Sequence, residues 1–344
     1  MASNLTLPKG SLVLITGVNG FIAGHLAKQL LTQGYRVRGT VRNAQKSKWL
    51  VDDLFKSEAS QGLFELATVE DMAVEGSFDT AIRGVDGVAH VATVATWDPN
   101  PNNVVPQTVA GVVNILKAAA KESSVKSFVF TSSIVAAAMP MPETRFHVDE
   151  KSWNDAAVSM AWAPPPYDAS RSMITYVASK VEAEKAIWKF VEEEKPQFRT
   201  NAVLPYTVFG PLLHAQQNAS TDAWLFTLYA GNTEATEMMK ASQSIHVEDV
   251  ALLHAAAILD PSVKNRRIHA WSDEFIWNDV LAIFRKLQPN RQFIDDLPDK
   301  ARMTATVDDK LTKDLLKKWG GRDGPFGLER SVKDAIEGIQ PSSV

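Results

Sequence analysis

The chain has 344 residues, of which 45% are hydrophobic and 22% charged, as is typical of a globular protein with a sizeable core. A net charge of −4 gives no electrostatic case for binding nucleic acid or an acidic membrane, and the absence of cysteine excludes disulfides, thiolate metal sites and cysteine nucleophiles. The first ten residues lack the apolar core of a signal peptide and no segment reaches membrane-spanning length, so we expect a cytoplasmic protein.

The next stretch has the pattern of a strand, a tight turn and a helix. Residues 12–15 are an unbroken apolar run, typical of a strand buried on both faces, and residues 21–33 follow helical spacing until Gly34. Between them stands the turn Thr16-Gly17-Val18-Asn19-Gly20. Free backbone N–H groups and the positive end of a helix then meet at one point, which predicts a pyrophosphate site that needs no basic side chain.

The glycines of this turn have distinct tasks in that prediction. Gly17 permits the tight turn, and Gly20 lets the backbone approach the phosphates. The third position of the pattern is Ala23, with Gly24 one residue late, and a small residue suffices there because its task is close helix–strand packing. The alternative is an ordinary turn between strand and helix whose glycines serve no ligand.

The second predicted strand, residues 35–41, indicates which dinucleotide would bind. In NAD-binding domains an acidic side chain near this strand end accepts from the ribose 2′-hydroxyl. Residues 35–48 contain no Asp or Glu, and Arg42, just past the strand, is placed to pair with a 2′-phosphate through its planar fork of donors. Arg42, with Lys46 nearby, therefore favours NADPH over NADH, and a solvated basic turn is the alternative.

Residues 64–69 and 87–93 are the third and fourth predicted strands. Asp71, after the third, is placed to accept from an adenine amino group or, equally, to cap a helix. Small residues at the exit of the fourth would let a cofactor lie across the carboxyl end of the sheet. His90, inside an apolar run, is expected to be a hydrogen-bonded core histidine and not a catalytic one.

An amphipathic helix is predicted at residues 108–121, before the fifth strand at 126–133. This strand ends in three hydroxyl residues, Thr131-Ser132-Ser133, whose side chains would point into a crevice or merely cap the turn. Residues 139–170 are polar and rich in proline, so we expect a long loop over the crevice that acts as a substrate lid.

Tyr176 and Lys180 stand four residues apart at the start of a predicted helix that runs to about residue 194. Residues i and i+4 share a helix face, so the two side chains can act together. A free tyrosine has a pKa of about 10, and a nearby ammonium stabilises the phenolate and brings this pKa toward neutrality. With Ser133 holding a carbonyl oxygen and a nicotinamide supplying hydride, the set has the groups that carbonyl reduction needs.

The remaining chain is predicted to complete one sheet and build a second unit. Residues 199–204 form a sixth strand, and residues 205–211 leave it as a constrained loop whose backbone would hold a nicotinamide carboxamide. We expect an α/β fold, with a doubly wound parallel Rossmann sheet in residues 1–205 and a smaller C-terminal α/β substrate domain mainly in residues 206–344. A strand returns to the first unit near 245–270. Later helices are expected at 220–229, 250–259, 277–287, 308–319 and 331–339, with strands at 245–249 and 266–270. No metal-ligand spacing is present, and no metal is expected.

These motifs, in this order, resemble the extended short-chain dehydrogenases/reductases, in the branch of dihydroflavonol-4-reductase and cinnamoyl-CoA reductase. Within that branch they are most similar to the yeast and fungal NADPH-dependent aldehyde or carbonyl reductases of the Sporobolomyces type. The matching pieces span most of the chain and include Thr16-Gly17-Val18-Asn19-Gly20-Phe21, Thr40-Val41-Arg42, Glu70-Asp71-Met72, Thr131-Ser132-Ser133, Tyr176-Val-Ala-Ser-Lys180, residues 205–211 and His246-Val-Glu-Asp249. Tyr206 departs from the family pattern.

The resemblance implies specific roles for residues of this chain. It implies catalytic Ser133, Tyr176 and Lys180, and an active-site asparagine on the helix that contains Asn114. It also implies NADPH or NADP+ as cofactor, with contacts from Thr16, Gly17, Asn19, Gly20, Phe21, Ile22, Arg42, Lys46, Asp71, Met72, Val91, Ala92, Thr93, Thr131, Tyr176, Lys180, Pro205, Thr207 and Val208.

An apolar substrate pocket is predicted from position alone. Its candidate residues, each of which is also a plausible core residue, are Trp97, Tyr167, Ile174, Trp224, Met239 and Ser242. The favoured function is NADPH-dependent reduction of aldehydes, ketones or keto esters to alcohols, by a monomer or homodimer that binds neither nucleic acid nor membrane. A dihydroflavonol or cinnamoyl-CoA reductase, a non-catalytic NADPH-sensing regulator and a sugar-nucleotide epimerase are the alternatives.

Overall fold

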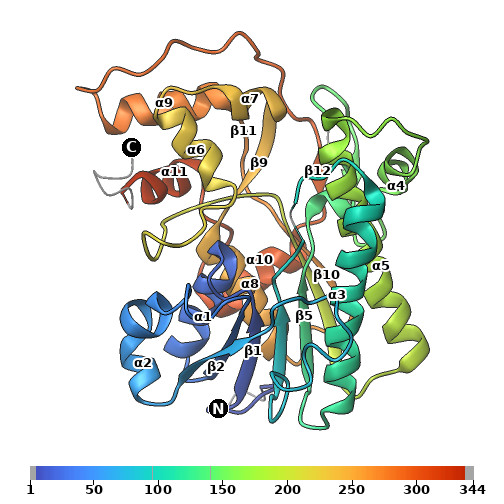
Figure 1. The fold of residues 1–344 in the computed structure, drawn as a ribbon. Helices are drawn as coiled ribbons and strands as arrows, with labels where there is room; N and C mark the ends of the chain where they lie inside the picture. The colour runs from blue at the N-terminus through green and yellow to red at the C-terminus, as the bar shows by residue number, and fades with distance from the viewer. Residues whose placement is uncertain (1–4, 95, 140, 338–344) are drawn as a thin grey trace.

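Seven parallel strands form the central sheet (Figure 1) of the computed structural model, which describes residues 5–94, 96–139 and 141–337. Their order is β10-β7-β5-β4-β1-β2-β3, so the direction of winding reverses between β1 and β4. In open α/β sheets, ligands bind at this reversal, beyond the carboxyl ends of the strands. The doubly wound prediction is confirmed. The strands are β1 (Leu12–Thr16), β2 (Arg36–Val41), β3 (Phe64–Thr68), β4 (Gly87–His90), β5 (Ser127–Thr131), β7 (Arg199–Pro205) and β10 (Arg267–Ala270).

The apolar run of β1 is divided between two cores because successive side chains of a strand point to opposite faces. Val13 and Ile15 pack with α1 (Phe21–Thr32) and α8 (Val247–Leu259). Leu12 and Leu14 pack on the other face with residues of α3 (Pro101–Lys121) and α5 (Ser172–Glu194). Two layers of helices therefore cover the sheet, and they hold the strand ends in fixed positions.

The helix α8 shows why the second half of the chain belongs to this sheet. Nearly every residue of its sequence VEDVALLHAAAIL is buried, because the sheet, α1 and α10 (Lys310–Gly320) surround it. The chain then returns to the sheet edge as β10, which pairs with β7.

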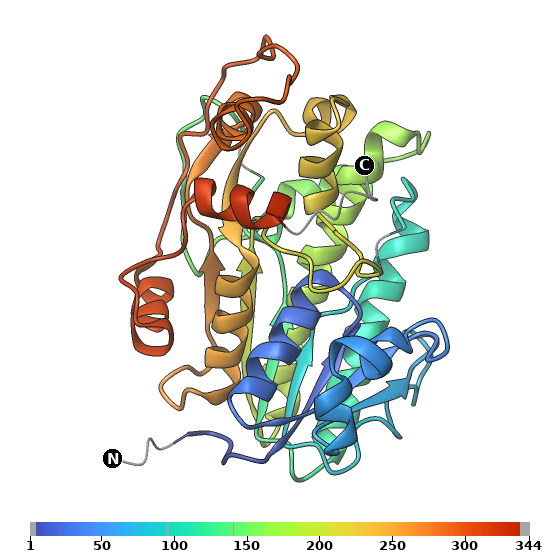
Figure 2. The ribbon, with the colours of Figure 1, turned by 90° about the vertical axis from the view of Figure 1, so that its left-hand side faces the viewer.

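A second, three-stranded sheet lies beyond the carboxyl ends of the main strands (Figures 1 and 2). Its order is β11-β9-β8, and the sequence analysis predicted only part of one of these strands. The apolar cluster beneath it joins Phe209, Phe275, Trp277 and Phe284 to helix residues. The elements of this unit are β8 (Thr207–Phe209), β9 (Ala241–His246), β11 (Glu274–Ile276), α6 (Asp222–Tyr229), α7 (Glu234–Met238), α9 (Trp277–Leu287) and α11 (Leu328–Glu337).

The segment 139–170, expected to be a long loop, contains ordered elements. The strand β6 (His147–Val148) pairs with β12 (Thr306–Val307), and the helix α4 (Asp155–Ala161) packs on α5. The Asn154 side chain caps α4 by accepting from Ala157 N at 3.2 Å. The short helices elsewhere are η1 (Leu50–Leu54), α2 (Lys56–Ser60), η2 (Ile134–Ala136) and η3 (Ala169–Arg171).

Capping side chains explain two shifted boundaries. The helix predicted at 108–121 begins at Pro101, because Asn100 accepts from Asn102 N and proline suits the first helical turn. The strand predicted at 245–249 ends at His246, whose ring accepts from Glu248 N and caps α8. Positions 338 and 339 of the last predicted helix lie outside the described residues. Within the described ranges, no helix combines the length and hydropathy needed to span a membrane.

Candidate active site

The turn between β1 and α1 is built for a close approach from outside. Gly17 has φ +64°, and a Cβ there would lie 3.0 Å from the Cβ of Ala92. Gly20 donates its N–H to Gly17 O at 2.8 Å and is the N-cap of α1. No side chain caps the first turn of α1, and that turn has no acidic residue, so the positive end of the helix faces the crevice. This cradle fits a pyrophosphate.

The late glycine of the pattern has a separate explanation. A Cβ on Gly24 would lie 2.5 Å from Gln217 Nε2, and this amide donates to Gly20 O at 3.0 Å. A segment of the C-terminal half, residues 210–218, therefore lies against the glycine turn. His25 Nε2 contacts Pro211 O at 2.8 Å, and His214 stacks on Trp49. Sequence reasoning missed this contact because nothing local links Gln217 to the turn.

The basic side chains of β2 and the turn after it differ in whether they already bind protein groups. Arg38 donates to Glu65 Oε1 at 2.6 Å and to the carbonyls of Ala81 and Arg83. Arg42 and Lys46 are exposed, and their side chains form no hydrogen bond or ion pair with any described residue. They are thus available to an anion such as a 2′-phosphate.

The loop after β3 is fixed from α3. Asp71 Oδ1 accepts from Ala73 N at 2.8 Å, in a turn and not at a helix N-terminus. The side chain of Asn114 donates to Met72 O and Val74 O, both at 3.0 Å. The resemblance implied an active-site asparagine on this helix, but both amide hydrogens of Asn114 are used to hold the 72–74 backbone.

The exit of β4 is tied to β1 by Thr16. The Thr16 hydroxyl oxygen accepts from Val91 N and Ala92 N, both at 3.0 Å, and lies 3.0 Å from His90 Nδ1. Its side chain is therefore occupied, so any cofactor contact from Thr16 falls to its backbone. His90 is 1% exposed and burial lowers its pKa to about 3, consistent with the core histidine expected. Thr93 Oγ1 is buried with no hydrogen-bond partner among the described residues, which leaves a polar atom for a ligand.

Ser133, Tyr176 and Lys180 converge at the carboxyl end of β5. The Ser133 hydroxyl donates to Pro205 O at 3.5 Å, and it lies close enough to the Tyr176 hydroxyl to lower the pKa of that phenol. Lys180 is 2% exposed and its Nζ donates to Thr131 O at 2.8 Å. Tyr176 remains partly exposed. The chain thus brings the three predicted side chains to one place.

Burial dominates the electrostatics of this trio. Burial raises the pKa of Tyr176 to about 12, although its hydrogen bond with Ser133 opposes that rise. Burial also lowers the pKa of Lys180 to about 8, against the attraction of Glu184. In the cofactor-free protein burial dominates the pKa of Tyr176, and Ser133 is the group that opposes the rise, so the lowering of this pKa by Lys180 stays a prediction. Tyr176 is therefore a neutral phenol near pH 7.

The predicted pocket residues fall into separate groups. The Trp97 ring lies 5.4 Å from the Tyr176 ring and is 45% exposed. The Thr207 hydroxyl contacts Ser242 Oγ at 2.6 Å and Met239 Sδ at 3.6 Å, so Thr207 faces predicted pocket residues. Three others are held by local packing, with Tyr167 under the Arg171 guanidinium, Ile174 beside Val177 and Val158, and Trp224 on the C-terminal cluster.

The loop after β7 offers fewer backbone contacts than expected. The N–H and carbonyl of Val208 both bond the Thr221 hydroxyl, at 3.2 and 2.7 Å. The prediction that Val208 holds a carboxamide through its backbone is therefore disfavoured, since both groups are occupied. Pro205 O faces Ser133 and remains near the trio.

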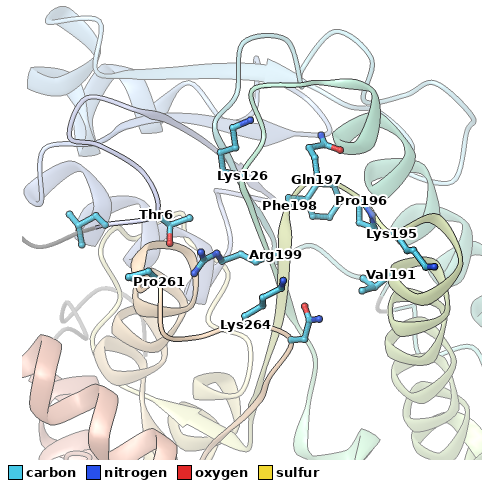
Figure 3. A pocket seen from close by; sticks show the side chains of 12 residues that line it. Thr6, Lys126, Val191, Lys195, Pro196, Gln197, Phe198, Arg199, Pro261 and Lys264 are labelled. Carbon is cyan, nitrogen blue, oxygen red and sulfur yellow. The ribbon is translucent and has the colours of Figure 1, made fainter.

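A hollow of about 650 Å³ lies elsewhere, around the amino ends of β5 and β7 (Figure 3). It is lined by Lys126, Lys195, Arg199 and Lys264 among others. Lys126 donates to Ser123 O and Arg199 to Asp260 O, so these two cations satisfy carbonyls just past the ends of α3 and α8. Because these residues lie at the end of the sheet opposite Tyr176, the hollow takes no part in the candidate active site. Among the described residues, no group of three metal-ligating side chains occurs.

Comparison with known proteins agrees with this geometry. The model of the NAD dependent epimerase/dehydratase family matches residues 13–269. The chain is 41% identical to aldehyde reductase 2 of Sporidiobolus salmonicolor over 97% of both chains, and 36% identical to the ketoreductase adrE of Penicillium roqueforti over 97% of this chain and 98% of the relative. The crystal structure of the yeast methylglyoxal/isovaleraldehyde reductase Gre2 complexed with NADPH is 26% identical, with a TM-score of 0.78 over 95% of this chain and 98% of that one.

Proposed function

The chain belongs to the NAD-dependent epimerase/dehydratase family, with an extended short-chain dehydrogenase/reductase fold, and from that premise we propose that it is an NADPH-dependent carbonyl reductase. It reduces small-molecule aldehydes, ketones or keto esters to alcohols. The observation that carries this proposal is the convergence of Ser133, Tyr176 and Lys180 at the carboxyl end of β5, beside β4 and the reversal of the sheet where ligands bind in open α/β folds.

Each member of the trio has one task. Tyr176, a neutral phenol at pH 7, donates a proton to the carbonyl oxygen, and Ser133 holds that oxygen by a hydrogen bond. Lys180 keeps a positive charge beside the site, which favours the phenolate left after proton transfer and gives a donor for ribose hydroxyls. When bound, NADPH supplies the hydride, and the protein contributes position and charge.

The cofactor site is proposed along the carboxyl ends of β1, β2 and β4. The open first turn of α1 receives the pyrophosphate, and exposed Arg42, with Lys46 beside it in sequence, receives the 2′-phosphate. Asp71 keeps one carboxylate oxygen for the adenine while the other holds Ala73 N. The orphaned hydroxyl of Thr93 supports a polar ligand beside β4.

The substrate is proposed to enter between Trp97 and the Thr207, Met239 and Ser242 group. An aromatic or branched apolar substituent would fit there, because the Trp97 ring is exposed and the buried hydroxyls of Thr207 and Ser242 bond each other. We also propose a cytoplasmic location, with which the cysteine-free composition is compatible. The chain is proposed to be a monomer or homodimer, which size-exclusion chromatography would test. The dihydroflavonol and cinnamoyl-CoA alternative is less favoured, because an aldehyde reductase and a ketoreductase are more similar to the chain, at 41% and 36% identity, than a dihydroflavonol 4-reductase at 32%.

The test is NADPH consumption with a panel of aldehydes, aryl ketones, keto esters and dihydroflavonols. We expect turnover of aldehydes, ketones or keto esters in preference to dihydroflavonols, and faster turnover with NADPH than with NADH. Tight NADPH binding without turnover of any carbonyl would support the regulator instead. Preferred turnover of dihydroflavonols would move the chain to the other branch.

A further inference from the structure

A buried carboxylate on α5, close to the trio of Ser133, Tyr176 and Lys180, has no task in the proposed reaction. Glu184 follows Lys180 by one helical turn on α5 and is fully buried. Its partner is Arg267 of β10, 5% exposed, which donates from Nε to Oε1 at 2.7 Å and from Nη2 to Oε2 at 3.3 Å. A buried ion pair is costly to form, and well-packed apolar side chains would often serve stability as well.

The same carboxylate also holds the strand end that carries Ser133. The Ser132 hydroxyl donates to Glu184 Oε2 at 2.6 Å, and Trp188 Nε1 donates to Oε1 at 3.2 Å. Ser132 lies between Thr131, whose carbonyl accepts from Lys180, and Ser133. Glu184 therefore fixes the backbone on which two members of the trio depend.

Arg267 extends this connection to the segment that precedes α4. Its Nη1 donates to Glu150 O at 3.0 Å and to Ser152 O at 2.6 Å. Its guanidinium lies 3.9 Å from the centre of the Trp153 ring. All parts of this side chain are used, so the Glu184–Arg267 pair joins β10, α5, the end of β5 and residues 150–153 in one polar network.

We propose that Glu184 is a positioning residue for the carbonyl reduction, whose carboxylate fixes the strand end at Ser132 and keeps the Lys180 amine charged. This inference rests on the proposed function for its catalytic meaning. Arg267 has the opposite influence on Lys180, because it neutralises part of the Glu184 charge.

The charges around Lys180 support this role. Burial lowers the pKa of Lys180 to about 8, and Glu184 is the group that raises it. His90, on β4, is neutral near pH 7 because burial lowers its pKa to about 3. On β10, the Arg267 guanidinium pairs with Glu184, and burial lowers the pKa of His269, so its ring is neutral near pH 7. Glu184 is therefore the one anion among the groups that act on Lys180 in the described part of the chain.

Variants with opposite charge changes separate this role from a merely structural one. Glu184→Gln removes the negative charge, and Arg267→Met removes the positive charge that competes for it. Both lower the stability of the fold, since each leaves a buried partner uncompensated. Only a charge effect on Lys180 moves their pH profiles in opposite directions.

The expected result is a shift in the alkaline limb of the pH profile, which is the fall of kcat/KM at high pH as Lys180 loses its proton. With Glu184→Gln the limb moves to lower pH by about one pH unit, so activity at pH 9 falls about tenfold more than at pH 6.5. With Arg267→Met it moves to higher pH. Ser132→Ala, which removes one hydrogen bond and no charge, lowers kcat and leaves the limb in place. If Glu184→Gln does not fold, the last two variants still decide the proposal.

A matched control and a direct titration complete the experiment. Asp249 is a second buried carboxylate paired with an arginine, Arg322, and Asp249→Asn is expected to lower stability without moving the limb. The Lys180 amine is also titrated by NMR in cofactor-free protein with labelled lysine, its signal assigned by loss in Lys180→Arg. Equal titration in wild type, Glu184→Gln and Arg267→Met would overturn the proposal. Absence of carbonyl turnover in the wild type would instead overturn the proposed function, and the titration would still report on Glu184.

Discussion

Tyr176 is a neutral phenol in the cofactor-free protein, and this suits a group that must give up a proton. Burial raises its pKa to about 12, so the proton is present at neutral pH. Its release is favoured only when negative charge develops on a nearby carbonyl oxygen. The ammonium of Lys180 and the hydroxyl of Ser133 are then the nearby groups that stabilise the phenolate.

Removal of the Tyr176 hydroxyl tests this role. We expect Tyr176→Phe to lower kcat by about 10²–10⁴-fold, the usual contribution of a general acid, with little change in NADPH affinity measured by fluorescence titration. Tyr35→Phe is the matched control, because the Tyr35 hydroxyl bonds only the Leu7 carbonyl among the described residues. A Tyr176→Phe enzyme with near-normal kcat would assign the proton to another donor.

Arg42 and Arg38 form a matched pair for the choice of cofactor. Arg42 has no described partner, so Arg42→Ala is expected to raise KM for NADPH about 10–100-fold, the loss of charge-assisted hydrogen bonds, and to leave KM for NADH nearly unchanged. Arg38→Ala should lower stability, because its donors bind Glu65, Ala81 and Arg83, without changing the preference. Equal effects of Arg42→Ala on both cofactors would contradict the 2′-phosphate contact.

At the scale of single elements, the turn from β1 to α1 depends on backbone freedom. Gly17 has φ +64°, so Gly17→Ala strains the backbone of the turn. The added Cβ would also lie only 3.0 Å from the Ala92 Cβ and would push on the exit of β4. We expect a loss of about 1–3 kcal/mol in the free energy of unfolding, measured with urea, and a clear loss of NADPH affinity.

Gly62 provides the control for this prediction. It has φ +69° and no atom within 4 Å of an added Cβ, so Gly62→Ala carries the backbone strain alone. NADPH affinity should be unchanged in that variant. If both substitutions lowered NADPH affinity equally, the close approach at Gly17 would not matter for the cofactor.

The elements of the first half follow from local signals, and the places where prediction failed have physical causes. The unbroken apolar run of β1 indicates a strand buried on both faces, and the four-residue spacing of Tyr176 and Lys180 indicates one helix face, so both could be read from the sequence. The helix α3 begins at Pro101 and not at residue 108 because Asn100 caps it, and sequence alone does not distinguish a capping asparagine from one in a loop. The strand β8 has three residues, too few for a periodic pattern.

Contacts between distant segments set the parts of the site that could not be predicted. Glu184 and Arg267 are far apart in the chain, and only the pairing of β10 with β7 brings them together. Gln217 reaches Gly20 through the fold of the C-terminal half. The closeness of the trio was predictable because Tyr176 and Lys180 share one helix and Ser133 follows two residues after the end of β5. The hydrogen bonds that occupy the Thr16 side chain and the Val208 backbone could not be predicted, because their partners Val91 and Thr221 belong to other segments.

At the scale of the whole molecule, buried histidines make the fold sensitive to acid. Burial lowers the pKa of His90 to about 3 and those of His25 and His254 to about 4. Each is neutral in the folded protein, whereas an unfolded chain binds a proton at a pKa of about 6.5. The unfolded state therefore binds more protons below pH 6.5, and stability is complete above this value and falls as the pH decreases toward the folded pKa values.

The expected change of the free energy of unfolding with pH is measurable by urea unfolding at a series of pH values. Three histidines give a loss of up to about 4 kcal/mol per pH unit between pH 6 and pH 4.5, which is a large share of the stability of an ordinary domain. His147 is exposed, and its replacement by glutamine should leave the slope unchanged. A stability that stays constant from pH 7 to pH 5 would mean that these histidines are protonated in the folded protein. The hydrogen bond of His254 with Thr131 would then have to rearrange, because His254 Nδ1 donates to Val250 O, Nε2 accepts from Thr131, and a protonated ring no longer accepts.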